Sequence, residues 1–174
     1  WDNSNFADWG KEGTFIQYGP AWAQVSAGPF RMFKGFLSEG GIRSPLIISG
    51  AGVQGSGRIS DAVTHIMDIP ATILQAAGVP HPDTLNGKPV APLQGTSLDP
   101  VLSAKDDSIR GPDAWIGWEL FGNRAVREGN WKLLSLCAPF GNGQWQLYDL
   151  NSDPGETTDV SGERPDVTQR LISH

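Results

Sequence analysis

The sequence has little of what would bind a nucleic acid, form a disulfide or cross a membrane. One cysteine, Cys137, among 174 residues excludes a disulfide within the chain. The 13 Lys and Arg against 19 Asp and Glu give a net charge of −6, and no basic stripe is interleaved with aromatics. No apolar run approaches the roughly 20 residues of a membrane span. We therefore expect neither a nucleic-acid partner nor a membrane span.

The first part of the chain is rich in aromatic residues but poor in regular patterns. Residues 1–30 mix tryptophans with Gly, Asn and Pro, which predicts a long surface loop that can include one short helix. Leu46–Ile48 is a short apolar run between Pro45 and Gly50, typical of a strand buried on both faces in a parallel sheet. This run predicts an α/β layer.

A helix is predicted over residues 68–78. Asp68 can cap the first turn, Pro70 lies where a missing N–H costs little, and Gly78 can end the helix. Residues 79–112 that follow are dense in Pro, Gly, Asn and Asp, so we expect a connector across the surface and a boundary between two parts there.

The last part predicts a small antiparallel sheet and one helix. Four short aromatic and aliphatic runs are separated by Gly-Asn and Asn-Gly breaks, which are typical of hairpins. The runs are Ala114–Phe121, Arg124–Arg127, Trp131–Leu136 and Gln144–Leu150. Residues 165–172 can form a helix that begins at Pro165 and turns Val167 and Leu171, four apart, toward the sheet.

One lysine, Lys34, lies close to a glycine pair, Gly40 and Gly41. A lysine ammonium is a compact charge with three donors, which suits a tetrahedral anion, and glycines let backbone approach closely or take a positive φ. Most lysines are solvated surface groups, so only the context favours a site. Arg43 can either neutralise an anion or brace the loop through an ion pair with Glu39 or with a carboxylate elsewhere, and we leave it out of the site.

Four elements resemble motifs of the type I sulfatases and follow one another in the family's order. They are Phe33–Pro45, similar to a lysine followed by W/T-E/Q-G-G-I/V-R-x-P; Asp68–Gly78, similar to the D-x-x-P-T-L-L-x-x-A-G helix; Trp118–Lys132, similar to the segment ending in G-x-W-K; and Gln146–Val160, similar to Y-D-L-x-x-D-P-x-E-x-x-D-L. The chain thus resembles the later part of a bacterial arylsulfatase of the alkaline phosphatase superfamily.

The resemblance implies a fold and a site. Residues 1–105 would complete a sulfatase-like three-layer α/β catalytic domain, and residues 106–174 would form a small antiparallel four-stranded sheet with one C-terminal helix. Lys34 would contact the sulfate of an aryl or alkyl sulfate monoester. The family's formylglycine nucleophile and its calcium ligands are not matched in this chain, so we expect them in an N-terminal remainder of the same protein. Alone, the chain would be inactive, and the sequence leaves a periplasmic or secreted location open.

Three patterns imitate other sites. Residues 137–139, Cys-Ala-Pro, start like the formylglycine motif, but Phe140 and Gly141 replace its Ser and Arg, so we interpret Cys137 as a small buried or turn-flanking thiol. Asp2-Asn3 resembles a metal-binding D-N-G without its glycine, and one such pair cannot supply the six to eight oxygens of calcium. Residues 50–55 fit G-x-G-x-x-G, but further glycine follows, which favours a loop over a dinucleotide site.

Two other functions fit the same residues. A phosphomonoester or phosphonate hydrolase of the superfamily would also bind a tetrahedral anion, and a non-catalytic binding module would keep the fold without the nucleophile. The residues that precede Trp1 in the whole protein would separate these functions, because a C/S-x-P-x-R motif there indicates a sulfatase.

Overall fold

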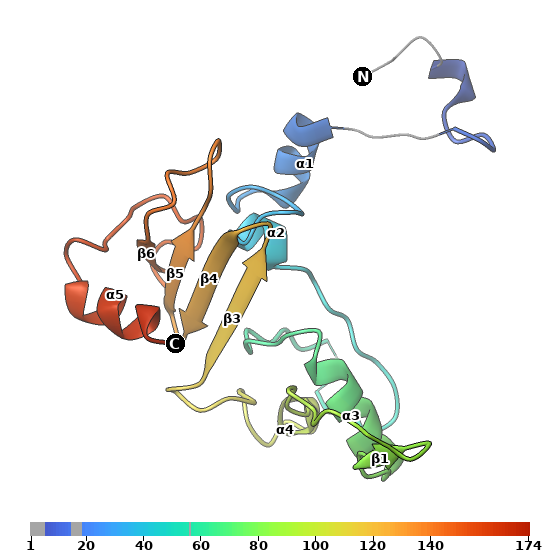
Figure 1. Ribbon diagram of the computed structural model, residues 1–174. Coiled ribbons are helices and arrows are strands. Elements are labelled where there is room, and N and C mark those ends of the chain that lie inside the picture. Colours follow the sequence, from blue (N-terminus) through green and yellow to red (C-terminus); the bar gives the residue numbers. More distant parts are fainter. Residues whose placement is uncertain (1–5, 15–18, 56) are drawn as a thin grey trace. The chain divides into compact units, whose positions relative to one another are not determined.

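The computed structural model of the chain describes residues 6–14, 19–55 and 57–174 (Figure 1). They divide into two compact units. The sheet unit comprises Trp1–Pro45 and Asp113–His174, and the middle unit comprises Leu46–Pro112. The expected division near residue 105 concerns the domains of a whole sulfatase and stays a prediction.

A four-stranded antiparallel sheet organises the sheet unit, as the sequence predicts. Its strands lie in chain order, β3 (Trp115–Leu120), β4 (Asn123–Glu128), β5 (Trp131–Ser135) and β6 (Gln146–Asp149). Leu120 pairs with Asn123, so Phe121 and Gly122 form a two-residue hairpin loop, with φ values of 54° and 79°. Two positive φ angles match the twist of the strands. The turn therefore lies one residue earlier than the Gly-Asn break suggests.

The two faces of this sheet bury different sets of side chains, because neighbouring residues of a strand point to opposite faces. On one face lie Leu133 and Leu147 of the sheet with Val167 and Leu171 of α5 (Pro165–Ile172), which confirms the predicted helix and its inward stripe. On the other face, sheet residues pack against the segment before and within α2 (Glu39–Ile42). That second cluster comprises Leu37, Ala125, Leu134, Leu136, Tyr148 and Leu150, with Phe36, Ile42 and Trp118 against it. The segment that contains Lys34 is thus attached to the sheet.

The described part of residues 1–30 contains two short helices. They are the 3₁₀ helix η1 (Phe6–Asp8) and α1 (Gly19–Ala27). No side chain of α1 among those described is buried. The described part thus contains two helices where the sequence predicts one, and the absence of buried residues in α1 agrees with the predicted surface location.

The middle unit contains two helices, α3 (Asp68–Ala77) and α4 (Asp99–Leu102). It also contains a hairpin of two strands with two residues each, β1 (Thr84–Leu85) and β2 (Lys88–Pro89). The predicted helix is confirmed, and Gly78 ends it with φ 65° while its N–H donates to the carbonyls of Gln75 and Leu74. Such a left-handed position costs glycine no steric strain.

The strand predicted at Leu46–Ile48 does not form. These residues have no strand assignment, and Ile47 is 92% exposed. A strand buried on both faces needs hydrogen-bonding neighbours, and within the described ranges no segment pairs with this backbone. The apolar run therefore lies open at the surface of the middle unit.

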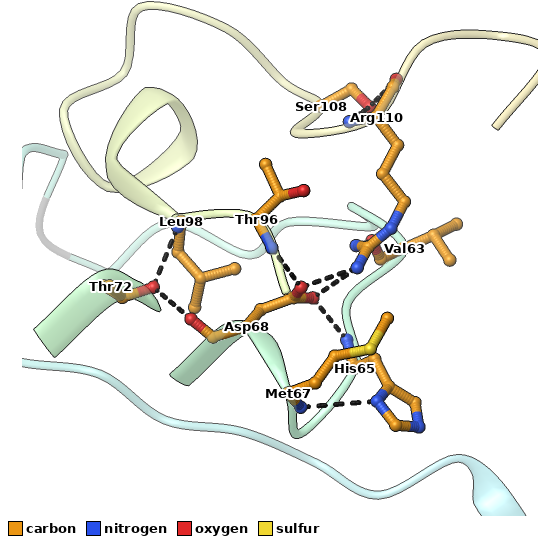
Figure 2. A network of polar contacts seen from close by, with 9 residues as sticks. All are labelled: Val63, His65, Met67, Asp68, Thr72, Thr96, Leu98, Ser108 and Arg110. Carbon is orange, nitrogen blue, oxygen red and sulfur yellow. Dashed lines mark hydrogen bonds and ion pairs between the residues drawn. The ribbon is translucent and has the colours of Figure 1, made fainter. Parts of the chain in front are cut away.

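A buried carboxylate, Asp68, joins separate segments of the middle unit (Figure 2). Its oxygens lie 2.6 and 2.8 Å from Nη2 of Arg110, and they accept hydrogen bonds from the N–H groups of His65 and Thr96. The hydroxyl of Thr72 donates to the carbonyl of Asp68 and accepts from the N–H of Leu98. Asp68 thus does not cap the following turn, as the sequence suggested, but fixes the segments around the helix start.

No described helix is long and apolar enough to cross a membrane.

Leu171→Ala should lower the free energy of unfolding by about 2 to 5 kcal/mol, because it opens a cavity at a side chain that is fully buried between α5 and the sheet. The neighbouring Ile172 is 40% exposed and gives a matched control, Ile172→Ala, for which we expect a much smaller loss. Urea denaturation of both variants measures the difference, and equal losses would contradict the packing.

Asp68→Asn should destabilise the chain by about 3 kcal/mol near pH 7, because the nearly buried Arg110 loses its carboxylate. Burial raises the pKa of Asp68, but the hydrogen bonds from Arg110, Thr96 and His65 outweigh it and hold this pKa below 3.8. A lowered folded-state pKa stabilises the fold above the unfolded-state value, and this stabilisation is lost as the pH falls through the folded-state pKa. The difference from the native chain should therefore shrink below about pH 3.8.

Denaturation at several pH values between 7 and 3 measures this trend. Asp61→Asn, at an exposed aspartate of the same unit, is the control and should change stability little at any pH. A loss for Asp68→Asn that stays constant over the whole range would contradict the lowered pKa.

Candidate functional site

Lys34 lies at the tip of a tight turn. The N–H of Phe36 donates to the carbonyl of Phe33 at 3.1 Å, and Gly35 occupies the third position with φ 106°, where glycine is favoured. Lys34 is exposed, and in the part of the chain that the structure describes its ammonium has no hydrogen bond or ion pair. The ammonium is therefore available to an anion.

The base of this turn is held by aromatic contacts. The rings of Phe33 and Phe36 meet edge to face at 5.2 Å, and those of Phe36 and Phe140 at 4.7 Å. Phe36 also packs on the cluster that includes Leu134 and Tyr148. The turn thus presents an exposed lysine on an anchored backbone.

Gly40 and Gly41 serve close backbone approach rather than a positive φ. A Cβ on Gly40 would lie 2.2 Å from the carbonyl oxygen of Met32, and one on Gly41 would lie 2.1 Å from that of Phe36. Both distances are far too short, so only glycine lets α2 pack directly against the turn. The N–H of Gly40 also donates to the carbonyl of Arg31 at 2.9 Å.

A buried cluster of three charges lies behind this turn. Nζ of Lys132 on β5 lies 2.8 Å from Oε1 of Glu39 and 2.8 Å from Oε1 of Glu156. The N–H of Glu39 donates to Oε2 of Glu156 at 2.8 Å. Lys132 is 0% exposed and both glutamates are 2% exposed. The cluster thus joins α2, the sheet and the acidic loop after β6 by charged contacts in the interior.

The cluster contains two carboxylates and one ammonium, and the pKa of Glu156 is raised above its ordinary value. Burial raises the pKa of Glu156, the attraction of Lys132 opposes that rise, and the charge of Glu39 adds to it. Glu156 also has φ 55°, which is uncommon for a residue with a side chain. Its hydrogen bond to the N–H of Glu39 and its ion pair with Lys132 hold it there.

Sequence reasoning missed this cluster, although each member belongs to a recognised motif. Glu39 precedes the glycine pair, Lys132 ends the G-x-W-K segment, and Glu156 is the glutamate of the D-P-x-E element. A signal was present, since a lysine beside apolar Leu133 and Leu134 in a central strand needs a charged partner.

Two arginines brace the same region. Arg31 donates to the hydroxyl of Tyr148 at 2.9 Å, which ties the segment before the turn to β6. Burial raises the pKa of Tyr148, and the charge of Arg31 opposes that rise. Nη1 of Arg43 lies 3.9 Å from Oε2 of Glu39, and its guanidinium lies 4.7 Å from the centre of the Phe30 ring. Of the two roles open for Arg43, these contacts favour bracing.

The patterns that imitate other sites form none in the described ranges. Cys137 is exposed and flanks the β3–β4 turn, with Sγ 3.2 Å from the carbonyl oxygen of Gly122. Residues 50–55 form turns and do not open a helix. No three His, Cys, Asp or Glu side chains among the described residues are arranged to hold a metal ion. The described residues therefore offer no ligand set for the calcium that the resemblance implies, and Asp2-Asn3 lies outside them.

Comparisons with known proteins agree with the resemblance. The family profile described as N-sulphoglucosamine sulphohydrolase, C-terminal, matches residues 28–173. An uncharacterized sulfatase of Schizosaccharomyces pombe is 39% identical over 175 residues, which cover 99% of this chain and 31% of the relative. The arylsulfatase of Klebsiella aerogenes is 36% identical over 110 residues, which cover 63% of this chain and 24% of the relative. Human arylsulfatase K is 27% identical over 167 residues, which cover 91% of this chain and 30% of the relative.

A solved structure shows the same fold. The crystal structure of Ps i-CgsB superposes with a TM-score of 0.67 at 23% identity, over 84% of this chain and 31% of that chain. The chain spans about a quarter to a third of the length of its curated relatives. The matched profile covers more than half of the chain and includes Lys34 and the buried charges. The chain belongs to the sulfatase family, in the region of its C-terminal domain.

Proposed function

We propose that this chain is the portion of a sulfatase that supplies a sulfate-binding lysine, and that the whole protein hydrolyses aryl or alkyl sulfate monoesters. The observation that carries the proposal is Lys34 itself. Its ammonium, which has no partner among the residues that the structure describes, stands on an anchored turn inside the region that the sulfatase profile matches. The relatives named arylsulfatases support a sulfate ester as the substrate class.

Lys34 would act by electrostatics. Its positive charge would neutralise sulfate oxygens while negative charge moves toward the leaving group, a role that depends on a charge placed before the reaction starts. The formylglycine nucleophile and the calcium ion that the family resemblance implies would come from outside residues 1–174. The chain alone would then be inactive.

Lys34→Ala in the whole protein should lower kcat/KM for an aryl sulfate about a hundredfold, the usual order for loss of one preorganised electrostatic contact. Steady-state kinetics with 4-nitrophenyl sulfate measure this loss. Lys88→Ala is the matched control, because Lys88 is also exposed and, within the described residues, has no ion pair. Unchanged turnover in Lys34→Ala would reject Lys34 as the sulfate-binding residue.

The same protein should be assayed with 4-nitrophenyl phosphate. Faster hydrolysis of the phosphate than of the sulfate would favour the phosphomonoester hydrolase. Hydrolysis of neither ester would favour the non-catalytic binding module.

A further inference from the structure

We propose that Lys132 is a positioning residue for Lys34, acting through Glu39 and α2. This inference rests on the proposed function, because it assigns to a buried lysine the task of fixing where the sulfate-binding lysine stands. Lys132 itself is fully buried and touches no substrate.

The first link runs from the sheet to α2. Lys132 lies in β5, which pairs with β4 on one side and β6 on the other, so its backbone is fixed by two ladders. Its ammonium lies 2.8 Å from Glu39, the first residue of α2. A buried charge-assisted contact has strong distance and direction preferences, whereas apolar contacts can slide. The position of α2 on the sheet is therefore set at Glu39.

The second link runs from α2 to the turn. Gly40 and Gly41 follow Glu39 directly, and their Cα atoms lie against backbone of residues 31–36 with no room for a methyl group. The hydrogen bond from Gly40 to Arg31 fixes the start of that segment. A shift of α2 must therefore move the backbone on which Lys34 stands.

The glutamates show why a charge occupies the interior here. Burying an ammonium costs several kcal/mol that apolar residues would not cost, so the cluster is poorly explained by stability alone. Glu156 is tied to both partners, through its ion pair with Lys132 and through the N–H of Glu39. Three segments far apart in the sequence thus meet at these charges in one defined arrangement. The turn that carries Lys34 packs against one of these segments, α2.

A double-mutant cycle in the whole protein tests this link, with 4-nitrophenyl sulfate as the probe. Lys132→Met should lower kcat/KM by about tenfold to a hundredfold, since a displacement of about 1 Å of a binding group can cost a hundredfold. In a Lys34→Ala background, Lys132→Met should cause little further loss, because the displaced group is already absent. Such non-additivity is the signature of two residues that act through one contact.

A purely structural role gives a different result. Loss of folded protein would lower kcat with KM unchanged, and it would do so by the same factor with and without Lys34. Equal losses in the two backgrounds would overturn the inference. Unchanged activity in Lys34→Ala would overturn both this inference and the assignment of Lys34 in the proposed function. Equal losses for Lys132→Met in the two backgrounds, with Lys34→Ala itself impaired, would overturn this inference alone.

Two further variants test the two links separately if Lys132→Met folds poorly. Glu39→Gln retains an acceptor oxygen for Lys132 but removes the negative charge. Gly41→Ala places a methyl group against the backbone oxygen of Phe36 and so displaces the turn without changing a charge. Each should lower kcat/KM at least severalfold with Lys34 present and little without it. Gly162→Ala is the matched control, since a methyl group there would meet nothing within 4 Å, and it should leave activity unchanged. Losses for Glu39→Gln and Gly41→Ala that do not depend on Lys34 would overturn the inference.

Discussion

The ion pair of Lys132 with Glu39 and Glu156 is the interaction on which the rest of the sheet unit depends. An ammonium with no exposed surface cannot lose its partners without a large desolvation cost, so α2 and the loop after β6 must both stay where their carboxylates reach it. The apolar cluster around Leu134 and Tyr148 supplies the area that offsets this cost. The hydrophobic contacts hold the segments together, and the charges define their positions.

The elements that the sequence predicted are those whose determinants are local. The two tight hairpins follow from glycine-containing turns, and helix α5 follows from Pro165 with an apolar pair at Val167 and Leu171. The glycine pair pointed to close backbone approach or a positive φ, and the structure resolves this in favour of close approach. The residues around Lys34 in the sequence were enough to select it as a candidate site residue, but its sulfate contact stays a prediction.

The features that the sequence could not give depend on distant partners. Glu39 and Lys132 are 93 positions apart, and local reasoning paired Glu39 only with Arg43. The error at Leu46–Ile48 has the same origin, since an apolar run becomes a strand only when other strands flank it. Asp68 is a third case, because the residue predicted to cap a helix instead binds Arg110, which lies in a loop distant in the sequence.

Two acidic residues of the family motifs, Asp68 and Glu39, hold segments of the chain together through buried ion pairs. The carboxylate of Asp68 binds Arg110 and accepts hydrogen bonds from the N–H groups of His65 and Thr96, and the carboxylate of Glu39 binds Lys132. The ammonium of Lys34, by contrast, has no partner among the described residues and stands on a backbone fixed from both sides. Electrostatic catalysis is effective when charges are oriented before the substrate arrives, because they then need no reorganisation during the reaction. The proposed sulfate contact of Lys34 would be a contribution of this kind.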